Sequence, residues 1–305
     1  MGFRDGNRES ELLPVETAQA RVLEAVSLLG IERVALTDAL GRVIREDVAS
    51  DRNVPPADNS AMDGYAVIAA DVAGATRENP VVFAVIEDLP AGYVAKKSVG
   101  RGTAIRIMTG APVPAGADAV VKVEETDAGS SRVAVYCELR SGANIRRAGE
   151  DLRAGDVVVR SGTPIGPGEI GVLATLQRSD VDVAKRPTVA ILSTGDEVVE
   201  IDGEVGPGKI VNSNAWSLAA LTREAGAVPR VMPIVRDDRE ATVAAIEEAL
   251  ASDFIVSTGG VSAGAFDFVP EVLKELGATF HVHKISIKPG RPTIFATTPS
   301  GTLIF

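Results

Sequence analysis

Two short glycine-containing turns carry the residue types that bind phosphate groups. The first, Ser193-Thr194-Gly195-Asp196-Glu197, follows the apolar run TVAIL, and the second, from Ser257 to Gly264, follows DFIV. Glycine allows close approach to the backbone, so N–H groups and hydroxyls in such turns can surround phosphate oxygens. A single turn of this kind is more often an ordinary turn, but two in one small sheet favour a binding site. The candidate groups are those of Ser193, Gly195, Gly259, Gly260 and Ser262.

Three acidic residues follow expected strand ends close to these turns, namely Glu197, Asp237 and Asp267. Magnesium commonly binds one or two carboxylates together with waters and substrate oxygens, so these side chains could hold Mg²⁺ beside a phosphate group. Asp237 and Asp267 are also well placed to cap helices, which explains them about equally well. The two roles are compatible, and the sequence leaves both open.

A small positive group lies near the end of the chain. Lys284, Ser286 and Lys288 alternate with two isoleucines, which predicts a strand with one polar face, and Arg291 follows in a Pro-Gly turn. The chain as a whole has a net charge of −11. A local group of cations in such a chain favours an anion pocket over a merely solvated strand face.

Cysteine and histidine are scarce, which disfavours disulfides and a transition-metal centre. The single cysteine, Cys137, cannot form an internal disulfide, and its alternation with Val133 and Val135 predicts a packing role. His281 and His283 could be paired ligands on one strand face, but the chain has no further histidine to complete a zinc site.

The stretch PPADNSAMDGYA, from Pro55 to Ala66, fits neither a helix nor a strand pattern. It contains two carboxylates, an amide and a hydroxyl, and polar loops of this kind on a rigid scaffold often carry function. A turn stabilised by Asp58 and Asn59 is the structural alternative. Composition alone does not decide between the two.

The elements that must position these groups change character along the chain. A helix is predicted over Thr17–Leu29, ending at Gly30, and another is predicted to open at Pro167. Between them, short β-rich runs separated by glycine and proline turns predict a mostly β module. The runs are 66–70, 80–86, 103–108, 118–125 and 131–139.

From Pro187 onward, predicted strands alternate with predicted helices. This order is typical of a parallel sheet with crossover helices, which binds ligands outside the carboxyl ends of its strands. The helices are predicted to start at a Ser213 cap, at an Asp237 or Asp238 cap, and after Asp267. The predicted strands are 188–193, 230–235, 253–257, 280–287 and 293–296.

Composition excludes several classes of protein. A chain of 305 residues with 45% hydrophobic and 24% charged residues is globular, with two or three modules. The negative net charge argues against a nucleic-acid partner. No apolar run is long enough to span a membrane and the first residues match no secretory signal, so the predicted location is cytoplasmic.

Six segments in one register resemble the molybdopterin molybdenumtransferase family, which is related to the E domain of gephyrin. They are PPADNSAMDGYA, RIMTGAPVPAGADAVV, NIRRAGEDLRAGD, STGDEVV, GGVSAGAFDF and KISIKPGRP, in order from Pro55 to Pro292. The resemblance implies an elongated multidomain chain of α/β plus β class. Residues 1–53 and 144–186 would form a discontinuous linking and dimerisation domain, 54–143 a β-rich inserted domain, and 187–305 a doubly wound, parallel-sheet molybdopterin-binding domain.

Family sequences continue past the position of Phe305 with a stretch GLPGNPVS and a small β domain. The resemblance therefore predicts a C-terminally truncated chain, in which the domain at 187–305 is incomplete and the C-terminal β domain is absent. Asn212 is a second departure, because the family usually has an aspartate there, and only a mild change is expected from it.

The activity that the resemblance implies is transfer of molybdenum from molybdate to adenylylated molybdopterin, with release of AMP and use of a divalent metal, Mg²⁺. The site would lie between the β-rich module of one subunit and the α/β module of its partner in a homodimer. Carried over by position, the catalytic residues are Asp63, Thr109, Asp267, Lys284 and Lys288, the metal ligands are Glu197, Asp237 and Asp267, and Arg147 and Arg291 join the turn residues in binding substrate.

Two other functions remain open. The chain could be a catalytically weak scaffold or assembly protein, since the gephyrin relative shows that this fold can serve as a docking platform, and the absent C-terminal region favours this function. It could be a molybdopterin adenylyltransferase, which the α/β module resembles and which is also a candidate partner. The acid and lysine set favours the transferase, and the β-rich module with its DNSAMDGYA motif argues against the adenylyltransferase.

Overall fold

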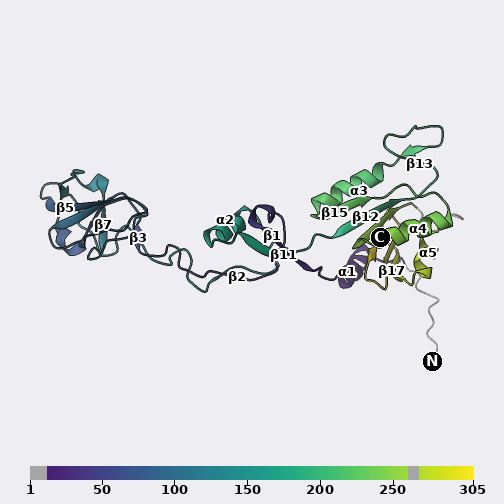
Figure 1. Ribbon diagram of the computed structural model, residues 1–305, viewed down its shortest axis with the longest axis horizontal. Helices are drawn as coiled ribbons and strands as arrows, with labels where there is room; N and C mark the ends of the chain where they lie inside the picture. Colours follow the sequence, from purple (N-terminus) through teal and green to yellow (C-terminus); the bar gives the residue numbers. More distant parts are fainter. Residues whose placement is uncertain (1–11, 260–267) are drawn as a thin grey trace, which may run out of the picture. The chain divides into compact units, whose positions relative to one another are not determined.

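The computed structural model describes residues 12–259 and 268–305 (Figure 1). The chain forms two compact units, each made of segments that are distant in sequence. The α/β unit comprises Met1–Arg45, Pro164–Gly166 and Asp180–Phe305, and the β-rich unit comprises Glu46–Thr163 and Pro167–Ser179.

The β-rich unit is built on a five-stranded sheet in the order β7-β4-β6-β5-β8. Both faces of this sheet are buried, one around Tyr65 and Phe83 and the other around Leu89 and Ile105, and all four residues of the inner strand β4 are buried. Each of the five predicted β-rich runs overlaps one of the strands, so the prediction of a mostly β module is confirmed, although β4 starts before its run and β5 ends after its run. The strands are β4 (Gly64–Val67), β5 (Val81–Leu89), β6 (Thr103–Ile107), β7 (Ala119–Lys122) and β8 (Arg132–Val135).

Short elements complete this unit. Cys137 lies just after β8, is half-buried and packs against the Tyr65 cluster, as predicted, and its burial raises the pKa of the thiol. The predicted helix at Pro167 is present, with proline at its first position. The elements are β2 (Val48–Ala49) paired with β10 (Val157–Val159), β3 (Asn59–Ser60) paired with β9 (Ile145–Arg146), α2 (Pro167–Thr175), and the 3-10 helices η2 (Ala69–Val72) and η3 (Val123–Glu125).

Gly64 in β4 is expected to tolerate no side chain. A Cβ at this position would lie 1.8 Å from the carbonyl oxygen of Val121 on the neighbouring strand β7. We expect Gly64→Ala to lower the free energy of unfolding by more than about 3 kcal/mol, because backbone must move on both strands. Gly171→Ala is the matched control, because Gly171 lies inside α2 with open space around it. This variant should be more stable than the wild type by about 1 kcal/mol. Urea unfolding of both variants measures the difference, and equal shifts would contradict this account.

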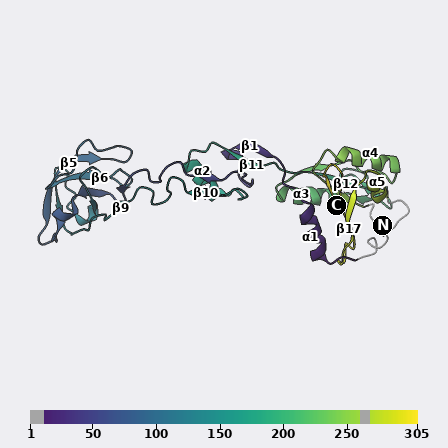
Figure 2. The same cartoon turned by 90° about the horizontal axis from the view of Figure 1, so that it is seen from below.

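The α/β unit contains a six-stranded sheet in the order β15-β12-β16-β19-β18-β17. Helices cover both faces of this sheet (Figure 2), and the side chains of β12 alternate between the two faces. Val189 and Ile191 pack under α3, whereas Ala190 and Leu192 pack under α4 and α5. The strands are β12 (Thr188–Ser193), β15 (Val228–Val231), β16 (Phe254–Thr258), β17 (Thr279–Lys284), β18 (Pro292–Thr297) and β19 (Leu303–Ile304).

The prediction of a doubly wound parallel sheet is correct for β15, β12 and β16 and wrong for β18, and the sequence pattern did not predict β19. Strands β15, β12, β16 and β19 are parallel, whereas β18 runs antiparallel to both β17 and β19. The connections on either side of β18, residues 285–291 and 298–302, are too short for the dozen or more residues that a parallel crossover needs. The sheet is therefore mixed.

Two predicted strands are shorter than the pattern indicates. The strand expected over 230–235 is β15 and ends at Val231, because Pro233 has no N–H to donate to a ladder. The strand expected over 280–287 is β17 and ends at Lys284, where the chain turns toward β18. Ser286 and Lys288 consequently lie outside the strand.

The helices of the α/β unit differ from the predictions mainly at their ends. The Asn212 side chain caps α3 (Ser213–Glu224), so the predicted Ser213 cap is wrong, and Asp238 rather than Asp237 caps α4 (Arg239–Ala249). Helix α5 (Val269–Glu275) has no side-chain cap, and Asp267 lies outside the described residues. Helix α1 (Val15–Ala25) ends before Gly30, whose carbonyl instead accepts a hydrogen bond from Lys185 N.

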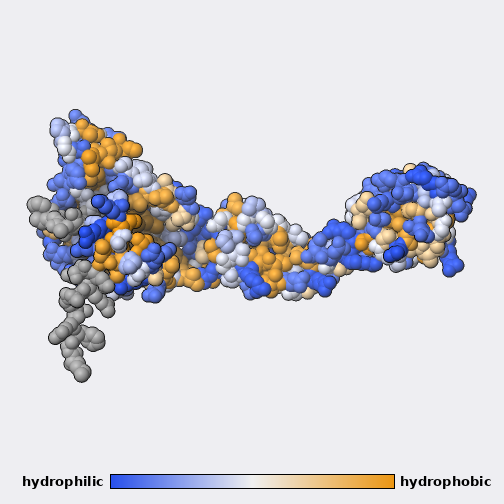
Figure 3. Space-filling view, turned by 180° about the vertical axis from the view of Figure 1, so that it is seen from behind, coloured by the Kyte–Doolittle hydropathy of each residue, from blue (hydrophilic) through white to orange (hydrophobic). Residues whose placement is uncertain are grey.

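The remaining elements of this unit are small. Strand β1 (Ile31–Ala35) pairs with β11 (Asp180–Ala184), η1 (Leu36–Asp38) follows β1, and β13 (Val198–Val199) pairs with β14 (Ile210–Val211). The arch between β13 and β14 carries the exposed apolar side chains of Ile201, Val205 and Ile210 (Figure 3). Within the described residues, none of the helices has both the length and the apolar composition to cross a bilayer.

Candidate functional site

A polar pocket of about 140 Å³ lies at the carboxyl ends of β12 and β16. This is the edge at which a sheet of this kind binds ligands, and both strands end there in hydroxyl residues, Ser193 and Thr258. The lining residues are Ser193, Thr194, Glu197, Val198, Ile210, Val211, Asn212, Ser213, Asn214, Thr258 and Gly259.

A chain of hydrogen bonds fixes the floor of this pocket. The Ser193 hydroxyl donates to Asn212 Oδ1 at 3.0 Å and lies 3.1 Å from the Thr258 hydroxyl. The Thr258 hydroxyl also lies 3.4 Å from the carbonyl oxygen of Leu192, so its one hydrogen can go either to Ser193 or to that carbonyl. Asn212 Oδ1 also accepts from Ala215 N at 3.3 Å, so one buried amide both caps α3 and orients Ser193.

Both turns require their glycines. Gly259 has φ +90°, and a Cβ there would lie 2.7 Å from the carbonyl oxygen of Thr194. Gly195 has φ +136°, and the carboxylate of Glu197 folds over it so closely that a Cβ would lie 2.5 Å from Glu197 Oε2. The backbone is thus bare at the two predicted turns, and the Glu197 carboxylate lies next to the first of them.

Two of the three predicted metal ligands lie at neighbouring turns. Asp237 Oδ2 accepts a hydrogen bond from the N–H of Asp196 at 3.4 Å, so this carboxylate lies beside the turn that carries Glu197. Within residues 12–259 and 268–305, no three acidic, histidine or cysteine side chains form a cluster that could hold a metal. Two hard carboxylates nevertheless suit Mg²⁺, which commonly takes one or two and completes its shell with water and phosphate oxygens.

Three predicted site residues lie outside the described residues, namely Gly260, Ser262 and Asp267. The predicted cations lie at the β17–β18 connection. Lys284 ends β17, and its carbonyl accepts from Leu13 N, whereas Lys288 and Arg291 are exposed in the connection itself. No ion-pair partner of these three cations is found in the described part of the chain, so their charge faces solvent.

The two histidines do not form a pair. The His281 ring lies against Phe295 and its Nε2 is 2.8 Å from the Thr297 hydroxyl, whereas the His283 ring stacks on Phe280. Phe295 and Phe280 belong to different core clusters, so the two rings pack in different places.

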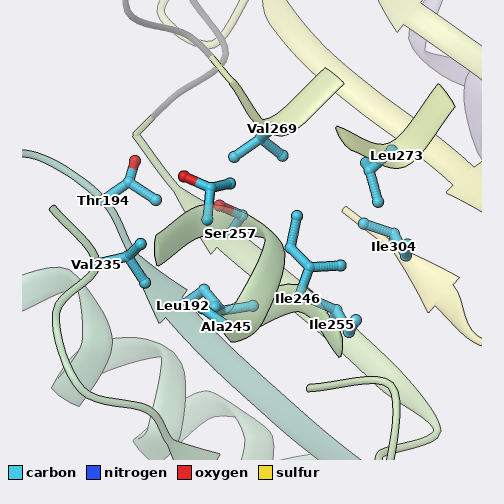
Figure 4. A pocket seen from close by; sticks show the side chains of 11 residues that line it. Leu192, Thr194, Val235, Ala245, Ile246, Ile255, Ser257, Val269, Leu273 and Ile304 are labelled. Atoms are coloured by element: carbon cyan, nitrogen blue, oxygen red, sulfur yellow. The ribbon is translucent and has the colours of Figure 1, made fainter. Parts of the chain in front are cut away.

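A second, closed pocket lies beneath the polar one, between the sheet and helices α4 and α5 (Figure 4). Its lining is apolar except for three hydroxyl residues, Thr194, Thr242 and Ser257. Thr242 donates to the carbonyl of Asp238, but the buried hydroxyls of Thr194 and Ser257 have no hydrogen-bond partner among the described residues. Sequence reasoning missed Thr194, which lines both pockets, because nothing in a Ser-Thr-Gly turn distinguishes the two hydroxyls.

In the β-rich unit, Asp63 and Thr109 are in direct contact. Asp63 Oδ1 accepts from both the backbone N–H and the hydroxyl of Thr109, each at 2.7 Å. These two hydrogen bonds hold the pKa of Asp63 below its usual range, with a smaller contribution from the charge of Arg106. The structure thus brings together the two residues that the resemblance assigns to this side of the site.

Arg147 is paired with the loop that carries Asp58 and Asp63. Its guanidinium pairs with Asp58 Oδ2 at 2.5 Å, and Asp58 Oδ1 accepts from Ala148 N at 2.8 Å. The hydrogen bond from Ala148 and the pairing with Arg147 hold the pKa of Asp58 below its usual range. Asp58 therefore fastens the loop that carries Asp63 to the segment that carries Arg147, as expected of a structural residue in this motif.

Two family models match the chain. The model of the MoeA N-terminal region (domain I and II) matches residues 13–176, and that of a probable molybdopterin binding domain matches residues 190–305. Among curated proteins, the molybdopterin molybdenumtransferase of Bacillus subtilis is 42% identical over 93% of this chain. The chain belongs to the molybdopterin molybdenumtransferase family.

A further curated relative and a solved structure support this family assignment. The molybdopterin molybdenumtransferase of a Nostoc species is 41% identical over 88% of the chain. The chain spans 67% of the length of the Bacillus protein and 62% of the Nostoc protein. The crystal structure of the molybdopterin biosynthesis MoeA protein from Pyrococcus horikoshii superposes with a TM-score of 0.83 and 33% identity, over 96% of this chain and 73% of that one.

Proposed function

We propose that this chain transfers molybdenum from molybdate to adenylylated molybdopterin and releases AMP. Its similarity to molybdopterin molybdenumtransferases supports the reaction. The observation that carries the proposal is the polar pocket, because hydroxyls, bare glycine backbone and a carboxylate meet at the edge of the sheet where a phosphorylated ligand would bind.

The residues of the α/β unit divide into two chemical groups. Ser193, Thr258 and the glycine turns offer hydroxyls and N–H groups to phosphate oxygens. Lys284, Lys288 and Arg291 offset the negative charge of phosphate and molybdate. Glu197 and Asp237, with Asp267, would hold Mg²⁺, which would supply positive charge that offsets the negative charge of the phosphate groups.

We further propose that the working form is a homodimer, with each site formed by the α/β unit of one copy and the β-rich unit of the other. The Asp63–Thr109 pair and the polar pocket are each preformed within their own unit, which is what two halves of a composite site require. A two-fold dimer would then contain two identical sites.

The decisive assay is release of AMP from adenylylated molybdopterin by the purified chain, with and without molybdate. The transferase is expected to release AMP only when molybdate and a divalent metal are present. An adenylyltransferase would instead consume ATP and release pyrophosphate. A scaffold would bind the substrate without turnover under either condition, and that result would overturn the proposal.

Lys288→Ala tests the part of the site that is proposed to bind anions. We expect molybdate to bind roughly fivefold more weakly, because the loss of an exposed charge costs about 1 kcal/mol of binding free energy. The affinity should also depend less on salt concentration. Calorimetric titration at low and high salt measures both effects. Lys185→Ala is the control, because that ammonium lies near Glu32 and away from the pocket. Unchanged affinity at all salt concentrations would exclude Lys288 from the site.

A further inference from the structure

The Asp63 side chain is held in one orientation. Its backbone carbonyl accepts from Val123 N at 3.0 Å, and its Oδ1 accepts both hydrogens that Thr109 can donate. Asp63 directly precedes Gly64, which pairs with Ile107, so the pair lies at one end of β4 and β6. Both residues are exposed, and a ligand can therefore reach them.

The direction of these hydrogen bonds determines what the pair can bind. A threonine hydroxyl has one hydrogen, and here that hydrogen points to Asp63 Oδ1. Thr109 Oγ1 can then offer a ligand only its lone pairs, and Asp63 Oδ2 accepts no hydrogen bond from the described residues. Every atom that the pair presents outward is an acceptor.

We propose that the Asp63–Thr109 pair binds an uncharged part of the substrate that carries two hydrogen-bond donors, and that it binds neither the phosphate nor the molybdate. This inference rests on the proposed function, whose substrate has two such parts. One is the 2-amino-pyrimidinone edge of the pterin, with an N–H beside an NH₂, and the other is the vicinal diol of the ribose. A carboxylate beside a hydroxyl oxygen matches either arrangement.

Charged ligands fit this pair poorly. An oxyanion would meet two acceptor atoms, one of which belongs to the ionised carboxylate of Asp63 and repels it. A divalent cation is disfavoured by the positive charge of Arg106, which lies close enough to lower the pKa of Asp63. The two units thereby divide the substrate between them, with anionic groups bound in the α/β unit and donor groups in the β-rich unit.

Asp63→Asn tests the proposal by reversing the polarity of one atom. The amide oxygen must take the place of Oδ1, because only an oxygen can accept from Thr109, and the NH₂ then replaces Oδ2 as a donor. The probes are 6-hydroxymethylpterin, AMP, molybdate and inorganic phosphate, titrated separately against the full chain. We expect binding of the pterin or of AMP to weaken roughly tenfold or more, while molybdate and phosphate bind as tightly as before or tighter.

The two neutral sources are distinguished by which probe loses affinity, and 2′-deoxy-AMP reports on the ribose diol directly. Asp127→Asn is the matched control, because Asp127 is an exposed carboxylate of the same unit that accepts from Ala134 N and Gly129 N in an ordinary turn. It should change none of the four affinities. Unfolding curves of both variants confirm that the fold is retained.

Two results would overturn the inference. In one, molybdate or phosphate affinity falls together with that of the neutral probes. In the other, wild-type protein binds the pterin and AMP no more tightly than Asp63→Asn does. Because binding is measured without turnover, protein that binds in the expected pattern but releases no AMP contradicts the proposed activity and not this inference.

Discussion

Chains with Asp63→Ala and chains with Glu197→Ala are each expected to be inactive, and mixing them is expected to restore about a quarter of the wild-type activity. Asp63 belongs to the β-rich unit and Glu197 to the α/β unit. If each site takes one unit from either copy, a mixed dimer has one site with both changes and one intact site. Random pairing makes about half the dimers mixed, and half of their sites are intact.

The control for this experiment is a mixture of Asp63→Ala and Thr109→Ala chains. Both changes damage the β-rich half, so every site of a mixed dimer keeps one damaged half and no activity should return. Pull-down through a tag on one chain establishes that mixed dimers form. If they form and the first mixture stays inactive, or if both mixtures recover equally, the composite site is wrong.

The position of the polar pocket could be predicted because it depends on local pattern. The runs TVAILS and DFIVS are apolar between their first and last residues, since strands of a parallel sheet covered on both faces must be apolar. Where such a run ends in hydroxyls and glycine, the strand also ends, and neighbouring parallel strands place their ends together. The family resemblance assigned Asp63 and Thr109 to the same side of the site, but their contact was not predicted, because 46 residues separate them and no periodicity links them.

The features that escaped prediction depend on contacts between distant segments. The alternation of Lys284, Ser286 and Lys288 is typical of a strand, but Leu13 pairs with the backbone at Ile285, and the chain turns there. Asn and Ser are about equally good helix caps, so the choice of Asn212 over its neighbour is decided by Ser193, which lies 19 residues earlier and bonds to the amide. Strand β18 is antiparallel because its connections are short, and strand patterns carry no information on direction.

Thr194→Val is expected to make the protein more stable by about 1–3 kcal/mol while weakening its function. The Thr194 side chain is only 9% exposed, and its hydroxyl has no partner among the described residues, so the buried oxygen costs desolvation energy that nothing returns. The closed pocket beside it has room for about 10 Å³, no more than a single water needs, and its other lining is apolar. Valine has nearly the same shape and suits the bridge that Thr194 makes with Val235.

Thr242→Val is the matched control for this expectation, since Thr242 lines the same pocket but its hydroxyl donates to the Asp238 carbonyl at 2.8 Å. That change should lower the free energy of unfolding by about 1 kcal/mol, because it removes a made hydrogen bond. Thr194 also lines the polar pocket. A contact between its hydroxyl and the ligand would explain why a threonine that lowers stability is present at this position. Opposite shifts in urea unfolding, together with weaker phosphate binding by Thr194→Val alone, would establish this. Destabilisation of both variants to the same extent would instead mean that a bound water satisfies Thr194, and the hydroxyl would then be part of the folded core rather than of the binding site.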